Sequence, residues 1–587
     1  MKIKHLFGLA VIAAMTASCS SNEDLGTAGP GTGTNETGAS YASITINLPT
    51  ASGTRAANDK FDGGTATEYA VNDATLLIFK KGTATSENEY EYVETASLGN
   101  LEPWKKDNTD DNGITTEATI TAELKNAKVG NTDYYALVIL NNKDKNNAEK
   151  VTLPTGTTTY GTWNVANNVK NLNDNKNGFY MANAPEFKTA GDEPTTLVKI
   201  QGIYRTKEEA HSKPGTTVHV ERGLAKVTVG SNSSSDYFAT DGAAVTENKY
   251  KNDVVKITKW ALDVTNNKSF PVHVTFGLKD GITPTDPTDQ KVPKYADIWN
   301  NTSRFVSQLT AEGAFKRVYW GIDPNYSMDL SNLTKCKAQF TLADDKGNGV
   351  TWNDGSGSEK PLYCLENTFD IKNMLQGQTT RVLLKATYTP NALASATETD
   401  KTFFMIGNSS DIWTTKTLKT QIASKAKEAK GITTDLTVVL KGDLLEGGTH
   451  FLTTENVSIK DGETEMVDAT LVGTLNTKLG LDKTKGVGIK TYKDGESYYI
   501  ARIKHFGDDL TPWNAGEVYG TDNDKYLGRY GVLRNNWYDL TVNSISGPGY
   551  PDVPEVKPDT PDDEDTKYIN VSVKILDWAK RSQKLDL

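Results

Sequence analysis

The clearest alternation of hydrophobic and polar residues lies close to the carboxyl end of the chain. Between Tyr568 and Trp578, aliphatic residues alternate with Asn, Ser and Lys. A period of two predicts a β-strand with one buried face. The residues assigned to this strand are Ile569, Val571, Val573 and Ile575, with Trp578 at its end. Because an isolated strand is not stable in water, it must pair with its own chain or with a neighbouring molecule.

The segment that precedes this strand, residues 548–567, is rich in Pro and Asp. Such a composition disfavours a central position in a sheet and favours an extended, solvated arm. The sequence therefore predicts that residues 568–587 form a donor strand, which the arm holds away from the body of the protein.

A second strand with one apolar face lies near the amino end, where Ile44, Ile46 and Leu48 alternate with polar residues. A short polar segment follows, and it contains Arg55, the first arginine of the chain. An exposed linker with a single arginine suits an Arg-specific protease, so we expect cleavage between Arg55 and Ala56. The similarity of the two strands suggests that the carboxyl-terminal strand replaces the removed one.

Short β-rich segments separated by turns fill the rest of the chain. One helix is predicted between Trp413 and Gly431, and Asp494-Gly495 between two β-rich arms predicts a hairpin over residues 491–500. The pattern predicts an all-β protein with few short helices, built from two β-sandwiches in tandem. We place the sandwiches at residues 56–232 and 233–547.

Residues 1–18 have the features of a signal peptide, with Lys2 and Lys4 ahead of an apolar run. The small residues that lead to Cys19 resemble a bacterial lipobox, in which the cysteine becomes the lipidated first residue. Thr16 departs from the usual pattern, and an ordinary signal peptide followed by a chance cysteine is the alternative. Residues 19–55 would then be a propeptide with a tether and the removable strand. No other apolar run reaches the roughly 18 residues that a membrane helix needs.

Composition narrows the function further. The 587-residue chain is too long for one core and carries a net charge of −11, which argues against a nucleic-acid partner. The six histidines show no metal-ligand spacing, and no phosphate loop or nucleophile motif is present. We therefore expect no enzyme activity, no cofactor and no metal. Cys336 and Cys364 leave two alternatives open in an exported protein, a disulfide or two buried thiols.

Several motifs, in their order along the chain, resemble the fimbrillins of type V pili, and within them the major subunits of short (minor) fimbriae. The motifs are Cys19, Thr54-Arg55-Ala56, Val220 to Val227 (VERGLAKV), Ile257 to Trp260 (ITKW), Leu533 to Tyr538 (LRNNWY) and Val571 to Trp578 (VSVKILDW). The resemblance implies a lipoprotein precursor with two transthyretin-like sandwich domains, anchored by lipid in the outer membrane until an Arg-specific protease removes the first strand. A homopolymer would then form as each groove accepts a strand from the next subunit, together with accessory anchor and tip fimbrial proteins.

The resulting hypothesis is a structural subunit of a fimbrial shaft at the cell surface, supporting adhesion and biofilm formation. The alternative is a monomeric surface lipoprotein that binds glycans, since tandem sandwiches with Trp and Tyr also suit that task. A surface hydrolase is the weakest of the three, because no nucleophile or metal cluster supports it.

Overall fold

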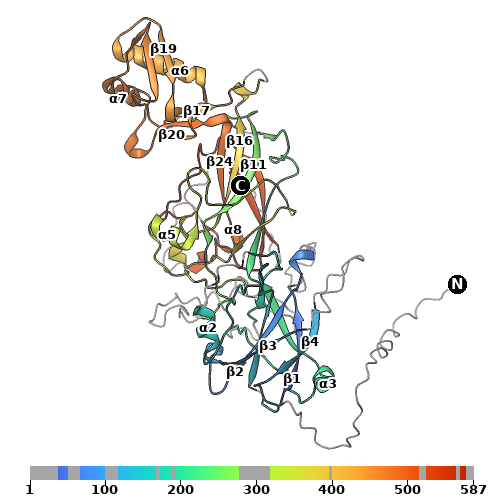
Figure 1. Cartoon of the computed structure of the whole chain (residues 1–587). Helices are drawn as coiled ribbons and strands as arrows, with labels where there is room; N and C mark the ends of the chain where they lie inside the picture. Colours follow the sequence, from blue (N-terminus) through green and yellow to red (C-terminus); the bar gives the residue numbers. More distant parts are fainter. Residues whose placement is uncertain are drawn as a thin grey trace, which may run out of the picture.

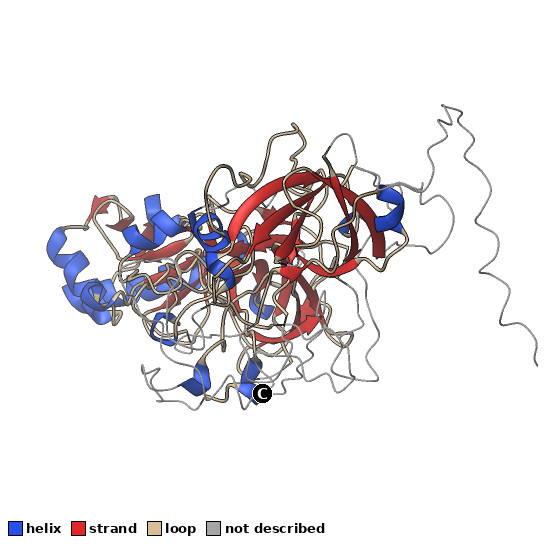
Figure 2. Ribbon diagram, turned by 90° about the horizontal axis from the view of Figure 1, so that it is seen from below, coloured by secondary structure: helices blue, strands red, loops and turns tan. Residues whose placement is uncertain are grey.

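The computed structural model describes residues 38–49, 66–99, 117–276, 318–513, 524–562 and 569–576, apart from short gaps at 132, 167–168, 170–171, 173, 187–193, 247, 358 and 396–398. The described part is elongated and built mainly from β-strands, so the predicted all-β class is confirmed (Figure 1). Viewed from below, the strands form curved sheets, and much of the helix lies toward one end (Figure 2).

The amino-terminal domain is one long sheet that wraps around a single core. Its strand order is β3 (Glu91–Ser97), β2 (Ala74–Lys80), β5 (Tyr134–Leu140), β6 (Met181–Asn183), β8 (Thr216–Arg222), β1 (Ser40–Asn47) and β4 (Glu117–Leu124), with β7 (Val198–Lys199) paired to β5. Aliphatic residues from both halves of the sheet meet in one cluster. The Glu94 carboxylate of β3 accepts hydrogen bonds from the backbone N–H groups of Lys125, Asn126 and Ala127, just after β4. This contact brings the two ends of the sheet together.

The carboxyl-terminal domain is a sandwich of two sheets. One contains β10 (Ala243–Ala244), β11 (Val254–Asp263), β16 (Arg381–Thr389) and β24 (Glu496–Arg502), with β14 (Trp352–Asn353) on β11. The other contains β15 (Leu362–Leu365), β9 (Leu224–Ser231), β25 (Trp537–Ile545) and β26 (Ile569–Leu576). Apolar side chains of both sheets share one core, as in other face-to-face sheet packings.

The predicted boundary between the two sandwiches, at residues 232 and 233, is wrong. β9 belongs to the second domain, because it pairs in parallel with β25 and antiparallel with β15. The chain therefore passes between the domains at Gly223, between β8 and β9. The continuous β-rich run over 218–229 hid this boundary, because it consists of two strands in different sheets.

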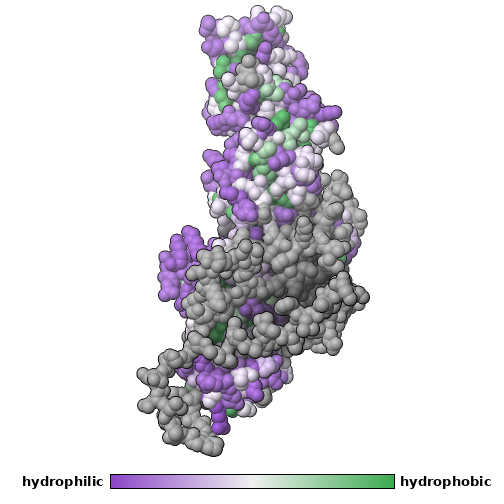
Figure 3. Space-filling view, turned by 90° about the vertical axis from the view of Figure 1, so that its right-hand side faces the viewer, coloured by the Kyte–Doolittle hydropathy of each residue, from purple (hydrophilic) through white to green (hydrophobic). Residues whose placement is uncertain are grey.

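A third compact unit is inserted between β16 and β24, and the sequence analysis did not predict it. It contains β17 (Phe403–Ile406), β18 (Trp413–Thr414), β19 (Leu436–Leu440), β20 (Gly448–His450), β21 (Val457–Asp461), β22 (Thr464–Glu465) and β23 (Ile489–Tyr492), with α6 (Thr415–Lys430) and α7 (Ala469–Lys478). It has its own hydrophobic core and lies at the far end of the molecule from β1 (Figure 1). Its visible surface mixes polar residues with small apolar areas (Figure 3).

The predicted helix is α6, and the sequence explains both of its ends. The Thr414 side chain caps the Thr417 N–H while the Thr417 hydroxyl accepts from the Thr414 N–H, which is a capping box. Gly431 ends the helix in the left-handed region at φ 67°. Leu418, Ile422 and Ala426 face the core of the insertion.

The remaining elements are short and connect the sheets. They are η1 (Ala66–Glu68), η2 (Glu87–Glu89), α2 (Tyr160–Ala166), α3 (Lys207–His211), β12 (Thr265–Asn266), α5 (Leu333–Gln339), β13 (Phe340–Thr341), η3 (Ile371–Asn373), η4 (Asn391–Leu393), η5 (Gly442–Leu445), η6 (Lys483–Lys485), η7 (Lys493–Gly495), α8 (Gly507–Leu510) and η8 (Asp524–Tyr526).

Candidate strand-exchange site

The first strand of the described chain, β1, is a central strand of the amino-terminal sheet. It pairs antiparallel with β4 from Ser40↔Leu124 to Asn47↔Glu117, and parallel with β8 from Ile44↔Thr216 to Asn47↔His219. The sequence places β1 before every other strand, yet the fold inserts it between two strands that follow much later. Its removal would leave both β4 and β8 with an unpaired backbone edge at this position.

The apolar face of β1 is buried in the amino-terminal core. Ile44 and Ile46 have no exposed surface, and Leu48, directly after the strand, is 2% exposed. Ala42 lies on the same face and is also fully buried. The predicted displaced strand is therefore a complete row of core residues, and a groove of matching length would remain without it.

The opposite face of β1 is held more loosely. The hydroxyls of Thr45 and Thr119 lie 2.9 Å apart at an exposed position, and Asn47 Nδ2 lies 3.4 Å from His219 Nε2. Ser43 and Thr121 are register partners, and within the described part of the chain their buried hydroxyls have no hydrogen-bond partner. Buried hydroxyls without partners are destabilising, so this face contributes less to holding the strand than the apolar face does.

The carboxyl-terminal strand does not stand away from the body, which corrects the sequence-based expectation. β26 pairs antiparallel with β25, from Trp537↔Leu576 to Ile545↔Ile569, and forms the edge of the described sheet. Four of the residues predicted for the donor strand, Ile569, Val571, Val573 and Ile575, therefore belong to a strand in the chain's own domain; Trp578 lies outside the described residues.

The acidic arm is also not solvated along its described part, residues 548–562. Val553 and Val556 are buried, at 3% and 4% exposure, and both pack in apolar clusters. The Arg381 guanidinium donates to the Pro554 carbonyl at 2.8 Å, and Arg502 Nε donates to the Asp562 carboxylate at 3.2 Å. The arm is therefore bound to the surface of the carboxyl-terminal sandwich.

The signal for this docking was present in the sequence as the Val553-Pro-Glu-Val556 spacing. Two apolar residues inside a Pro- and Asp-rich segment indicate local burial. The prediction of a solvated arm was based on the overall composition of the segment instead. Asp562 contributes a buried charge whose partners lie far away in sequence, at Arg502 and Thr379, so no local pattern could identify them. Burial raises the pKa of Asp562 above its ordinary value, and the nearby Arg502 opposes this effect.

The two cysteines in the described part of the chain are separate thiols, so the disulfide alternative is wrong. Cys336 lies on α5 in a small cluster with Val264 and Val556, whereas Cys364 on β15 faces the main sandwich core. Burial raises the pKa of the Cys336 thiol to about 11 and that of Cys364 to about 12. Both are therefore protonated and unreactive at neutral pH.

A buried polar cluster connects the two domains. Glu68 of η1 lies 2.8 Å from the Lys226 ammonium of β9 and accepts from the Tyr363 hydroxyl at 2.7 Å. Lys226 also lies 4.0 Å from the centre of the Trp537 ring on β25. The VERGLAKV motif of the sequence analysis thus supplies the residue that links the domains.

The remaining predicted site residues lie outside the described residues. They are Cys19, which we expect to carry lipid, and Arg55 and Ala56, which flank the predicted cleavage site. Within the described ranges, no group of His, Cys, Asp and Glu side chains could hold a metal ion, and no helix has the length and apolar character to cross a membrane.

Comparison with known proteins identifies the carboxyl-terminal part of the chain. Residues 490–584 match the family described as major fimbrial subunit protein type IV, fimbrillin, C-terminal. This range begins in β23 and includes β24, β25, the arm and β26. No curated protein matches the sequence.

Three solved structures illustrate the structural comparison. A candidate cell adhesion protein from Parabacteroides distasonis is 11% identical with a TM-score of 0.34, covering 92% of this chain and 98% of its own. A fimbrilin from Porphyromonas gingivalis is 12% identical with a TM-score of 0.32, covering 91% and 96%. The tip fimbrial protein Mfa3 from Porphyromonas gingivalis is 10% identical with a TM-score of 0.27, covering 92% and 100%.

These TM-scores are too low to support an argument on their own, and the sequence match over residues 490–584 is the informative finding. It includes the Leu533 to Tyr538 and Val571 to Trp578 motifs. The match confirms, over residues 490–584, the resemblance to fimbrillins that these motifs predict.

Proposed function

We propose that this protein is the repeating subunit of a fimbrial shaft, assembled by exchange of β1 for the carboxyl-terminal strand of a neighbouring copy. The fimbrillin match over residues 490–584 supports a fimbrial subunit at the cell surface, with a structural rather than an enzymatic role. In this proposal the precursor is a lipoprotein anchored in the outer membrane through Cys19. An Arg-specific protease then cuts between Arg55 and Ala56, and anchor and tip proteins complete the fimbrium.

The observation that carries the proposal is the position of β1. It is hydrogen-bonded on both sides and fully buried on one face. Its covalent connection to the later strands of the domain runs through residues 48–65, the segment that contains Arg55. Cleavage there would separate β1 from the body while leaving every other described strand intact.

The energy of the vacated groove explains why a replacement strand is needed. Burial of Ile44, Ile46 and Leu48 contributes about 1.5–3 kcal/mol each, or about 5–9 kcal/mol together, before chain entropy is subtracted. Loss of β1 from the cleaved subunit would expose part of the apolar core and the backbone edges of β4 and β8. A strand from another copy restores both, in the mode known as β-augmentation.

The position of β26 makes it a suitable donor, because an edge strand is hydrogen-bonded to a neighbouring strand on one side and can form further backbone hydrogen bonds on the other. On its own domain it hydrogen-bonds to β25 alone among the described strands. In the groove it would pair on both sides, with β4 and β8. Its four alternating aliphatic residues match the apolar row that β1 presents to the core.

The docked arm limits how β26 can move. If the contacts of Asp562 persist, the six residues 563–568 can span at most about 25 Å, at about 3.3–3.6 Å per residue step. Donation over a greater distance requires the arm to leave the sandwich as well. Because the donor and the groove lie on different domains, the contact is head-to-tail and propagates as an open filament.

The test is the composition of material sheared from cells that express the wild-type chain or Arg55→Ala. Mass spectrometry of wild-type filaments should find subunits that begin at Ala56, and the variant should remain a full-length monomer with lipid on Cys19. Lys60→Ala is the matched control, because it removes a basic residue from the same segment without removing the arginine.

Normal filaments with an uncut amino terminus in Arg55→Ala would refute the proposal. A lipidated, full-length monomer in the wild type would instead favour the monomeric glycan-binding lipoprotein.

A further inference from the structure

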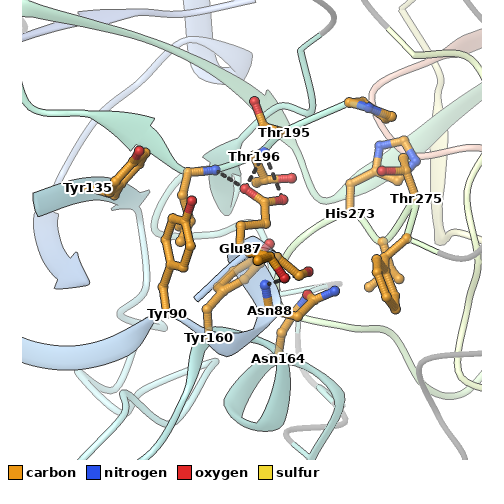
Figure 4. Close-up of a pocket in the computed structure, with 16 residues that line it drawn as sticks. Glu87, Asn88, Tyr90, Tyr135, Tyr160, Asn164, Thr195, Thr196, His273 and Thr275 are labelled. Atoms are coloured by element: carbon orange, nitrogen blue, oxygen red, sulfur yellow. Dashed lines mark hydrogen bonds between the residues drawn. The ribbon is translucent and has the colours of Figure 1, made fainter. Parts of the chain in front are cut away.

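A pocket of about 340 Å³ lies against the amino-terminal domain (Figure 4). It is formed by η2, β5, the start of α2, the segment before β7 and residues 273–276. Its volume is at the lower end of the roughly 300–1,000 Å³ range of small-molecule sites. None of its lining residues belongs to β1, the arm or β26.

Tyrosine rings form one side of this pocket. The Tyr90 and Tyr135 rings pack together with centroids 4.7 Å apart and planes inclined by 54°, and Tyr160 lies beneath them on α2. Tyr160 is held by an edge contact with Phe79, at a centroid distance of 5.7 Å. Tyr135 is only half-buried and lines the pocket.

The polar groups around the pocket are largely uncharged. Ten of its sixteen lining residues are Ser, Thr, Tyr or Asn, and Figure 4 shows Thr195, Thr196 and Thr275 around the space opposite the tyrosines. The Nδ2 group of Asn88 is buried and, within the described part of the chain, makes no hydrogen bond. A ligand oxygen would supply the acceptor that this donor needs.

The carboxylate and the imidazole that line the pocket are engaged by the protein itself. The Glu87 carboxylate accepts from the backbone N–H groups of Thr196 and Leu197 at 2.9–3.0 Å. The His273 ring has Nδ1 2.9 Å from Glu221 and Nε2 3.3 Å from the Trp320 carbonyl. The described residues that line the pocket include no lysine or arginine that would neutralise an anionic ligand.

We propose that this pocket binds a neutral sugar unit. A pyranose ring has an apolar face that packs on an aromatic ring, and its rim of hydroxyls needs the amide and hydroxyl partners found here. A cationic ligand fits less well, because Tyr90 and Tyr135 pack on each other instead of surrounding a central space, and the Glu87 charge is already compensated. The site is independent of strand exchange, so the protein would carry a glycan-binding function in addition to its structural one.

Saturation-transfer NMR on the full chain tests this proposal, with methyl β-galactoside and N-acetylglucosamine as neutral probes. N-acetylneuraminic acid and choline serve as the anionic and cationic probes. At about 10 mM probe, where sites with dissociation constants near 1 mM are mostly filled, we expect signals from at least one neutral probe and none from the charged ones.

Variants locate the binding. Tyr135→Ala should weaken binding of the neutral probe by about five- to tenfold, the size expected for one aromatic contact, whereas Tyr135→Phe should retain most of it. Asn88→Ala leaves the tyrosines in place and should weaken binding by about threefold or more. Tyr204→Ala is the matched control, since Tyr204 is also half-buried but does not line the pocket.

Three results would overturn the proposal: no signal from either neutral probe, stronger binding of choline or of the acid, or equal binding by the Tyr135→Ala, Asn88→Ala and Tyr204→Ala variants. Failure of this test leaves filament formation unaffected, so it is distinguishable from a failure of the shaft proposal.

Discussion

The substitution Ile46→Ala tests whether β1 belongs only to the precursor. Ile46 has no exposed surface and lies in register between Ala118 of β4 and Val218 of β8. Truncation of a buried isoleucine to alanine costs about 2–5 kcal/mol, so we take about 3 kcal/mol for this site. For a domain of this size, about 2–4 °C per kcal/mol corresponds to a fall of about 6–12 °C in the melting midpoint of the amino-terminal domain.

The same substitution should have no effect on the assembled subunit, because Ile46 leaves with the propeptide when the chain is cut after Arg55. The assay is thermal unfolding of the purified precursor and of sheared filaments, each with and without the substitution. Thr45→Ala is the control within the same strand, since the Thr45 hydroxyl lies on the exposed face and its loss should cost about 1 kcal/mol or less.

The reasoning fails if Ile46→Ala destabilises filaments and precursor to the same extent, because β1 would then still occupy the groove after assembly. It also fails if the precursor tolerates Ile46→Ala as well as Thr45→Ala, because the apolar row would then not hold the strand.

Two further predictions concern the surroundings of the groove. The His219 side chain lies 3.4 Å from Asn47 of β1, and burial lowers its pKa, so the folded precursor favours the neutral imidazole. The stability that this preference contributes is complete above the ordinary pKa of about 6.5 and is lost as the pH falls through the lowered value. Between about pH 7 and pH 5 the precursor's melting midpoint should fall more than that of His219→Gln, and identical profiles would contradict this. At the domain junction, Lys226→Ala leaves Glu68 buried without its ammonium partner and should cost about 3–5 kcal/mol in urea unfolding, whereas Lys226→Met combined with Glu68→Gln should cost much less. A double variant as unstable as Lys226→Ala would show that the charge pair is not the cause.

Local patterns were sufficient to predict strands β1 and β26 and helix α6, because such elements depend on residue periodicity and capping within one segment. The apolar rows of β1 and β26 and the helix α6 all follow from residue spacing. The pairing of those strands did not follow, since β26 reaches β25 across the whole arm and β9 joins β25 rather than the preceding β8. Such partners are set by long-range packing, which a single sequence does not display.

The Asp494-Gly495 turn shows the same limit at one position. Both residues adopt the positive φ values that the dipeptide favours, 52° and 77°. The two strands that flank them nevertheless do not pair: β23 joins β17 and β20 in the insertion, whereas β24 joins β16 in the sandwich. The predicted hairpin is therefore wrong although its turn is present, because the inserted unit ends at this point.

The arm illustrates a different reason for error. Its average composition is that of a solvated linker, but four residues decide where it lies: Val553 and Val556 through burial, Pro554 through its carbonyl, and Asp562 through Arg502. The pocket at Tyr135 could not be foreseen either, since its walls come from segments up to about 190 residues apart, between Thr85 and Phe276.

The central claim, that β26 leaves its own domain to complete a neighbour, is tested most directly by locking it in place. Thr541 and Ser572 are cross-strand partners of β25 and β26, and such pairs have Cβ atoms about 4.5–5.5 Å apart, close enough for a disulfide after a small adjustment. The double variant Thr541→Cys/Ser572→Cys, cleaved after Arg55, should stay monomeric when oxidised and assemble at the wild-type rate when reduced. The single variant Thr541→Cys should assemble under both conditions. Filaments formed at the normal rate by the oxidised, fully cross-linked double variant would contradict the account, because assembly would then proceed with the strand still bound to its own sheet.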